Sequence, residues 1–507
     1  MTGRTMKTKT VLIIVMALFF AMTSANLFAS SFGDTFGFSA EGMARGNAMT
    51  ATVNDWSSVY YNVAGLGKTK NLVEVISSDP EMNLKLQKEE GEKGDRGGKF
   101  TYPNQWAIGV LYVFPRMKLS INRYLADIGF PLKTNAANMD PYGFITIGGA
   151  LDINTIIKMP DFISSARLGV GMGLNSDFSL ANINDIDPRT HDFLRHGNEI
   201  RTASILVGLG LGLFNDAIGG GIGVNLAFSG KADAYMDAKM SGSIQVPIAD
   251  TSMKLKIVPG VITGVYLSPG KMISPFAGLE IGVSYRQETM LKIDPFKAGA
   301  GILGGVIEMS LLMSIQDYYS PHVVNGGIAY TGGGVTLSYD MSYEMWGRNT
   351  LSMVWKSHYI GIPKLKNILL HKAGIKYETP LGWLAVMAGY SFVPSIVERD
   401  AGTKIGIRVD TLGTKVAPGM FNYLDNVKHN VSLGITFTVP QVWRFTGKIV
   451  ITPSYQLQYL VPRSVGKTGL HYTDGVQDDL LQSYFLNPRY RYGGMNHSLF
   501  VEVGMKI

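Results

Sequence analysis

The sequence predicts an all-β protein: a closed antiparallel transmembrane β-barrel of about 14 strands. Three observations support this fold class. They are apolar side chains that recur with a period of two, short turns that alternate with long connections, and an export signal at the N-terminus. Because lipid offers no partners to the backbone groups of an open sheet edge, a sheet that spans a membrane must close on itself.

The N-terminus has the three parts of a secretory signal peptide. Residues 1–9 are basic, residues 10–22 are apolar but too few to cross a bilayer, and small residues follow. We predict a signal peptide over residues 1–25, with cleavage after Ala25 or, as the alternative, after Ser31. No later stretch is an uninterrupted apolar run of roughly 18 residues, so we expect no spanning helix in the exported chain.

The period of two is clearest in residues 429–439, 335–344 and 497–507. In the first of these, Val431, Leu433 and Ile435 fall on one face while Ser432, Gly434 and Thr436 fall on the other. A half-buried sheet in a soluble protein shows the same alternation, so the connections decide. Short turns at 214–217, 331–334 and 378–382 alternate with long segments at 175–199, 344–367 and 393–427, as in transmembrane barrels.

Composition excludes several classes of function. The chain of 507 residues has no cysteine, which excludes disulfides and thiolate metal sites, and its net charge of +7 is scattered, which argues against nucleic acid as a partner. No HExxH, Walker A or Gly-x-Ser-x-Gly motif is present, and the 8 histidines are spread along the chain. We therefore expect no enzyme activity, no cofactor and no metal site.

Three neighbouring strand candidates carry glycines with a period of two. The sets are Gly169, Gly171 and Gly173; Gly208, Gly210 and Gly212; and Gly219, Gly221 and Gly223. Each set lies opposite apolar residues, so the glycines are predicted to face the lumen. Such glycines mark either the close approach of another backbone or a ligand, or a wall that needs them for its curvature. The sequence leaves both interpretations open.

Two motifs near the N-terminus resemble the hatch of a known family. In "SAEGMARGNA", Ala40, Met43, Ala44, Asn47 and Ala48 recur at helical spacing, and "NDWSSVYYNVAGLG" follows at 54–67. Both stretches resemble N-terminal motifs of the FadL/TodX family of outer-membrane long-chain fatty-acid and hydrocarbon transporters. The resemblance implies a hatch inside the barrel over residues 26–67 and a barrel over 68–507. The hatch residues that it marks are Arg45, Asp55, Asn62, Ala64, Gly65 and Leu66.

The resemblance continues along the chain. "GLEIGVSYRQET", "SPHVVNGGIAY" with "VTLSYDMSYEMW", and "HKAGIKYETPLGWLAVMAGYSFVPS" with "YLDNVKHNVSLGITF" follow in the order of the family's motifs. Pro394, Asp425 and His429 stand at positions that the family marks. Val63 departs from the pattern, because proline is common there in the family.

The family likeness implies the passive uptake of a hydrophobic molecule, a fatty acid or an aromatic hydrocarbon, by a monomer in the lipid of the bacterial outer membrane. Phe36 and Phe38, with Phe32 if it is retained, are implied as ligand-binding residues before the hatch helix. The compound carried stays open. The alternative is a plugged barrel that serves as an adhesin or a structural protein, and apolar lumen side chains beneath the long loops would argue against it.

Two further features bear on the mechanism. Arg45 needs a partner inside the barrel, and the inward-facing candidates are Glu280, Glu288, Asp340, Glu344 and Glu502. A salt bridge that anchors the hatch is favoured over ligand contact.

For a lateral opening in the wall we predict Gly169, Gly171, Gly173 and Asn175, where the resemblance places a kinked strand, with Pro259–Gly260 as the alternative.

Overall fold

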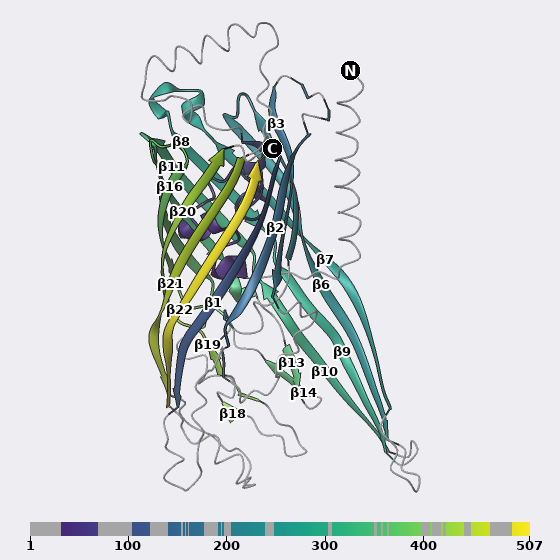
Figure 1. Ribbon diagram of the computed structural model, residues 1–507. Coiled ribbons are helices and arrows are strands. Elements are labelled where there is room, and N and C mark those ends of the chain that lie inside the picture. The colour runs from purple at the N-terminus through teal and green to yellow at the C-terminus, as the bar shows by residue number, and fades with distance from the viewer. Residues whose placement is uncertain are drawn as a thin grey trace.

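The structure, a computed structural model, describes most of the wall and the segment inside it (Figure 1). The described residues are 32–68, 104–121, 140–153, 156–157, 159–160, 162–176, 191–193, 195–196, 204–238, 248–302, 307–348, 352–355, 358–361, 365–397, 406–407, 417–418, 422–440, 448–466 and 489–506. The predicted signal peptide and both of its cleavage positions lie outside these residues.

Fourteen antiparallel strands of the described chain form a closed ring. In spatial order they are β1 (Gln105–Ile121), β2 (Tyr142–Asp152), β3 (Ile163–Asn175), β5 (Ser204–Leu213), β6 (Ile218–Ala238), β7 (Ile248–Leu267), β8 (Leu279–Arg286), β11 (Val323–Gly332), β12 (Val335–Glu344), β15 (Ile368–Glu378), β16 (Leu384–Val393), β20 (Lys428–Pro440), β21 (Lys448–Gly466) and β22 (Arg489–Lys506). The ring closes where β1 pairs with β22, with Gln105 opposite Lys506. The predicted fold class is confirmed.

Further strands lie outside the ring. The ends of β6 and β7 extend as a long hairpin, and β9 (Thr289–Ile302) pairs with β6 and with β10 (Ile307–Ser320). Two small antiparallel pairs are β13 (Ser352–Trp355) with β14 (His358–Gly361) and β17 (Gly406–Ile407) with β18 (Ala417–Pro418). β4 (His191–Phe193) pairs in parallel with β19 (Asn422–Leu424).

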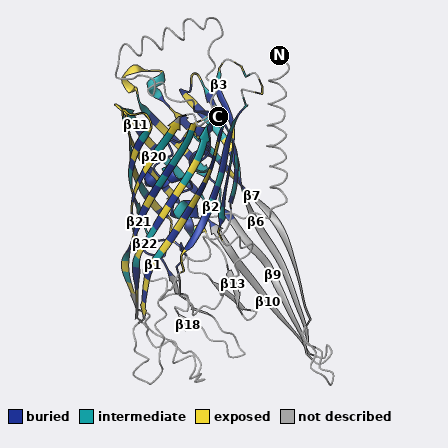
Figure 2. Ribbon diagram, in the orientation of Figure 1, coloured by how far each residue is buried: buried dark blue, intermediate teal, exposed yellow. Residues whose placement is uncertain are grey.

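The outer face of the wall is apolar. Along β20, Val431 and Leu433 are about half exposed while Ser432 between them is buried, which is the predicted alternation. The same change from one residue to the next runs along β12 and β22 (Figure 2). An apolar band of this extent is unfavourable in water and is the surface that a bilayer covers.

The two ends of the barrel differ. Antiparallel pairing puts the connections β5–β6, β11–β12 and β15–β16 at the end of the barrel where β22 ends. We call this the short-turn end and the opposite one the long-loop end. The short turns need left-handed backbone, which Gly333 and Gly334 supply at φ 59° and 77° in the β11–β12 turn. The β7–β8 connection at the same end contains two 3₁₀ turns, η6 (Pro269–Lys271) and η7 (Ser274–Phe276), and η8 (Trp346–Arg348) follows β12 at the other end.

Residues 32–68 fill the inside of the ring and form the hatch (Figure 1). They contain α2 (Phe32–Thr35), α3 (Ala40–Ala44), α4 (Ser58–Tyr61) and η1 (Val63–Gly67). The helix predicted from 40–48 ends at Ala44, because Gly46 and Asn47 adopt left-handed backbone at φ 61° and 64°. Among the described residues, no helix is both long and apolar enough to cross a membrane.

Candidate functional site: the hatch and the lumen

The glycines of the wall let the hatch backbone lie directly on it. A Cβ atom on Gly210 would come within 2.6 Å of the carbonyl oxygen of Val63, and one on Gly221 within 2.7 Å of the amide nitrogen of Ala64. Both distances are shorter than van der Waals contact allows. Gly210 on β5 and Gly221 on β6 therefore mark the close approach of another backbone, namely η1 of the hatch.

The glycines of β3 face hatch side chains instead. A Cβ on Gly169 would meet Val59 and Leu66, and one on Gly171 would meet Val59 and Phe38. The missing side chains make room for apolar hatch residues at this part of the wall. The glycine set on β3 thus also serves the packing of the hatch.

Arg167 on β3 fixes the C-terminal turn of the hatch. Its Nε donates to the carbonyl oxygen of Leu66 at 2.5 Å, and its Nη2 donates to those of Asn54, Gly65 and Lys68 at 2.8, 3.2 and 2.9 Å. Carbonyl groups at the end of a helical turn have no partners within the turn, and a guanidinium satisfies several at once. This role was not predicted from the sequence, although Arg167 lies on the same face of β3 as Gly169, Gly171 and Gly173.

The predicted hatch residues contact the wall as follows. Asn62 donates from Nδ2 to the carbonyl oxygens of Thr50 and Val265, at 2.9 and 3.1 Å, so it links the hatch to β7. Its Oδ1 accepts from the amide of Ala64 at 3.2 Å and caps η1. Asp55 instead stays within the hatch, where it accepts from the amide and hydroxyl of Ser57 at 2.8 and 2.6 Å; burial raises the pKa of its carboxyl group.

The predicted partners of Arg45 are wrong. Arg45 pairs with Glu41, one helical turn before it, at 3.1 Å, and donates to the hydroxyl of Ser338 on β12 at 3.1 Å. Glu41 also pairs with Lys376 of the wall at 3.4 Å. Burial alone would raise the pKa of Glu41, but Lys376 and Arg45 outweigh it and hold the pKa at about 2. An ion pair within the hatch forms more readily than a distant one, because the two side chains are already neighbours on the helix.

Three of the inward carboxylates anchor the hatch through other groups. Glu280 pairs with Lys68 at 3.0 Å, Asp340 accepts from the amide of Thr50 at 2.8 Å, and Glu502 accepts from the amide of Ala40 at 3.0 Å. The other two bind wall or loop side chains, since Glu344 accepts from Trp346 and Glu288 pairs with His322. The wall therefore holds both ends of the hatch by polar contacts.

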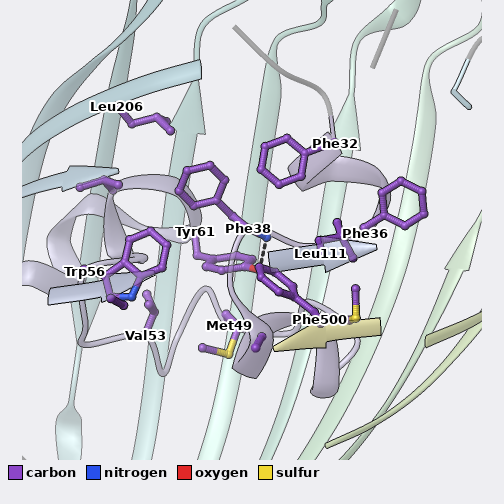
Figure 3. Packing of buried hydrophobic residues seen from close by; sticks show 14 of the residues in the cluster. Phe32, Phe36, Phe38, Met49, Val53, Trp56, Tyr61, Leu111, Leu206 and Phe500 are labelled. Carbon is purple, nitrogen blue, oxygen red and sulfur yellow. Dashed lines mark hydrogen bonds between the residues drawn. The ribbon is translucent and has the colours of Figure 1, made fainter. Parts of the chain in front are cut away.

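Phe32, Phe36 and Phe38 lie at the centre of the largest apolar cluster (Figure 3). The ring of Phe32 stacks on Phe144 of β2 with centroids 4.7 Å apart, and Phe36 contacts Tyr142 edge-on at 6.3 Å. All three phenylalanines are fully buried. We call this group, with Trp56, Tyr61, Leu111, Leu206 and Phe500, the aromatic cluster. It mixes hatch and wall residues, so a movement of the hatch would open it.

A layer of charged residues covers the aromatic cluster on the side of the long loops. Arg195 forms a two-pronged pair with Asp425, at 3.0 and 2.8 Å, and donates to the carbonyl oxygen of Pro394 at 2.7 Å. Lys428 lies 3.6 Å from the same carboxylate. Burial would raise the pKa of Asp425, but Arg195 and Lys428 outweigh it and lower the pKa. Arg195, Asp425 and Lys428, together with the β4–β19 pair and His196, form what we call the cap.

His196 joins the cap to the aromatic cluster. Its ring lies 6.1 Å from that of Phe36, its Nε2 is 3.4 Å from Nζ of Lys428, and its Nδ1 is 3.2 Å from Nδ2 of Asn496. Burial, with the charges of Lys428 and Arg195, holds the pKa of His196 well below its usual value. The imidazole is therefore neutral at physiological pH. Sequence reasoning missed Arg195 and His196, because only folding brings residues 195–196 next to 425–428.

Asp425 and His429 do not come together. His429 points outward from β20, where its Nδ1 lies 2.7 Å from the hydroxyl of Tyr390. Asp425 instead accepts from Arg195 and from the amide of Ile396. Within the residues that the structure covers, no group of three His, Asp or Glu side chains gathers as metal ligands would.

The strand at Gly169 to Asn175 is paired in this conformation. Gly169, Gly171 and Gly173 have partners on both β2 and β5, and Asn175 pairs with Phe144. Pro259 and Gly260 pair with β6, whereas the ladder between β7 and β8 reaches only to Ile262. The lateral opening therefore stays a prediction.

No family profile matches this sequence, and no curated protein matches it. Solved structures do resemble the chain in fold. A Pseudomonas aeruginosa FadL homologue covers 92% of this chain and 97% of its own length, with 13% identity and a TM-score of 0.50. The P. putida toluene transporter TodX covers 93% and 99%, with 13% identity and a TM-score of 0.46. At this identity a likeness shows the fold alone, and the first of the two confirms what the sequence motifs predict: the chain has the fold of the FadL homologue.

Proposed function

We propose that the protein is a channel for the passive uptake of hydrophobic molecules across the bacterial outer membrane. The aromatic cluster carries this proposal: Phe36 and Phe38, with Phe32, lie in the lumen on the part of the hatch next to the cap, where the family resemblance places a ligand site. Aromatic rings offer much apolar area to a hydrocarbon. A molecule that enters from the long-loop end would displace rings that now pack on one another.

The alternative, an adhesin or structural barrel, needs no apolar lumen. A second apolar cluster of Met117, Leu119, Phe193, Leu424, Leu460 and Tyr492 lies among the residues of the cap, in addition to the aromatic cluster. Apolar side chains beneath the long loops are the feature that distinguishes a channel from such a barrel. This arrangement favours transport.

Charge in the cap supports a fatty acid as one ligand. Asp425 is shared by Arg195 and Lys428, so the cap has two basic side chains for one carboxylate within ion-pair distance. A carboxylate head group would complement this charge while its chain lies in the aromatic cluster. An aromatic hydrocarbon would use the aromatic cluster alone.

Two variants and one matched control test the proposal. We expect Phe36→Ala with Phe38→Ala to weaken the binding of both oleate and pyrene about tenfold or more, since each truncation removes roughly 2 kcal/mol of apolar contact. Lys428→Gln should weaken oleate only. The control, Phe276→Ala with Phe437→Ala, removes the same side chains from the outer surface and the short-turn end.

Equilibrium dialysis of the purified protein with radiolabelled oleate and with pyrene gives the affinities, and migration of heated and unheated samples on gels confirms folding. Unchanged affinity in the double variant would remove the aromatic cluster as the ligand site. Mass spectrometry of lipid that co-purifies from native membranes identifies the compound carried.

We also propose that ligand leaves through the wall near β3. There the wall presents Gly169, Gly171 and Gly173, and only hatch side chains fill the space inside it. If the hatch moves inward, the wall at this strand has no side chains that block the way. An apolar solute that passes into lipid avoids the aqueous periplasm.

A further inference from the structure

The outer face of β1 changes from apolar to basic along its length. Its outward side chains are Trp106, Ile108, Val110, Tyr112 and Phe114, all large and exposed, followed by Arg116 and Lys118, which are exposed as well. The change occurs at the long-loop end, between Phe114 and Arg116. The strand thus crosses the outer boundary of the apolar band at this position.

The neighbouring strand β22 adds a third cation to the same place. Arg491 pairs in register with Ser120, and Gly493 pairs with Lys118, so a residue without a side chain separates the two cations. Arg491 is exposed. Figure 1 shows β21, β22 and β1 side by side on the near face of the barrel. We call Arg116, Lys118 and Arg491 the basic patch.

The basic patch has no counter-charge in the described part of the chain. None of its three side chains forms an ion pair, and Asp140, which is exposed just before β2, forms none with them. Elsewhere in the described chain, exposed Arg348 is paired with Glu288. Three unpaired cations on adjoining strands repel one another unless an anion lies among them.

Aromatic side chains place the basic patch at a defined depth. The rings of Tyr112 and Phe114 have centroids 4.8 Å apart and lie next to Arg116, on its short-turn side. Phe114 pairs in register with His497. Rings of this kind mark the level where hydrocarbon meets head groups. With a rise of about 3.3 Å per residue along a tilted strand, Arg116 and Lys118 lie about 5 and 10 Å beyond the rings, which is head-group depth.

His497 adds a polar ring on the short-turn side of the cations. Its Nδ1 lies 2.7 Å from the hydroxyl of Tyr455 on β21. Either atom can donate in this contact, and in the tautomer where the phenol donates to Nδ1 the imidazole proton lies on Nε2. An N–H group at the lipid boundary needs an acceptor, and the head groups supply it.

We propose that the basic patch, with His497 beneath it, binds the phosphate of a lipid in the leaflet at the long-loop end. A phosphate monoester supplies charge for the three cations and acceptor oxygens for the guanidinium groups and Nε2. The site lies on the outside of the wall, separate from the aromatic cluster in the lumen. It rests on the proposed membrane location and is independent of the ligand that is transported.

The test uses the full-length protein in detergent and two lipids that differ only in the phosphate, dioleoyl phosphatidic acid and dioleoylglycerol. Native mass spectrometry measures the apparent affinity for each. We expect wild type to prefer phosphatidic acid, and Arg116→Gln, Lys118→Gln and Arg491→Gln together to weaken its binding tenfold or more, since each cation attracts an anionic head group. Dioleoylglycerol binding should not change.

The matched control removes three positive charges at other places on the barrel, as Arg348→Gln, Lys366→Gln and Lys448→Gln. If the control loses phosphatidic acid as the patch variant does, net charge explains binding and the proposal is overturned. Displacement of the lipid by millimolar inorganic phosphate would also overturn it, because the site would then bind a free anion. Pyrene binding in the same samples reports on the lumen, so a failure of the proposed transport function is seen separately.

Discussion

Arg167 of the wall and Leu66 of the hatch are joined by a hydrogen bond of 2.5 Å from Nε to the carbonyl oxygen. The arginine is almost fully buried, and its Nη2 binds three further carbonyl groups of the hatch. Removing one partner of a buried charged contact is costly because the other partners stay desolvated. This one side chain therefore holds the end of the hatch against β3.

We predict that Arg167→Met releases the C-terminal turn of the hatch while the wall still assembles. The loss of several charge-assisted hydrogen bonds should destabilise docking by about 3–5 kcal/mol. The lumen would then admit small hydrophilic solutes, measured as single-channel conductance in planar bilayers. Arg348→Met removes an exposed arginine and is the control. Equal conductance in the two variants would contradict an anchoring role.

A second prediction concerns the glycines on β6. Gly221→Ala should displace η1, because the new Cβ would meet the backbone of Val63 and Ala64 at 2.7 Å. Gly220→Ala, one residue away, is the control, because the nearest atom to its Cβ lies 4.0 Å away on the outer face. We expect Gly221→Ala alone to lower stability by about 1–3 kcal/mol. Urea unfolding monitored by tryptophan fluorescence measures this, and equal midpoints for the two variants would refute the contact.

The wall was predictable from the sequence and the hatch contacts were only partly so. Alternation such as Val431, Ser432, Leu433 reflects a bilayer outside and polar groups inside, a property of each strand by itself. The glycine sets marked the contact but not which segment makes it. Asp425 with Arg195 joins residues 230 positions apart, and no local pattern encodes such a pair. The error over Arg45 had the opposite cause, because its partner Glu41 lies one turn away.

Our third prediction is that acid loosens the cap through His196. Its pKa is depressed in the folded protein by burial and by Lys428 and Arg195, so the stability it contributes is full above its unfolded pKa of about 6.5. That stability is lost as pH falls further, at about 1.4 kcal/mol per pH unit, because the unfolded or open form binds the proton. Asp425, whose pKa is lowered, stays ionised in this range.

Release of bound pyrene, which carries no titratable group, measures the opening of the cap. We expect the release rate to rise about fivefold between pH 6.5 and 5.5 in wild type and to stay constant in His196→Asn. His371→Asn, on the outer face of β15, should retain the wild-type dependence. The same pH profile in both variants would show that another group controls the cap.

The last prediction locates the exit by locking the wall, which the absence of native cysteine makes straightforward. Leu151 and Leu168 are register partners on β2 and β3, and Val170 and Val207 are partners on β3 and β5. Cysteines at directly opposed positions of an antiparallel pair are close enough for a disulfide. If ligand leaves at β3, oxidation of one of these pairs should stop uptake and reduction should restore it.

A disulfide between β16 and β20, from Val386→Cys and Ile435→Cys, should leave uptake unchanged. Transport that continues with both β3 pairs locked would move the exit to Pro259–Gly260, where the ladder between β7 and β8 has already ended.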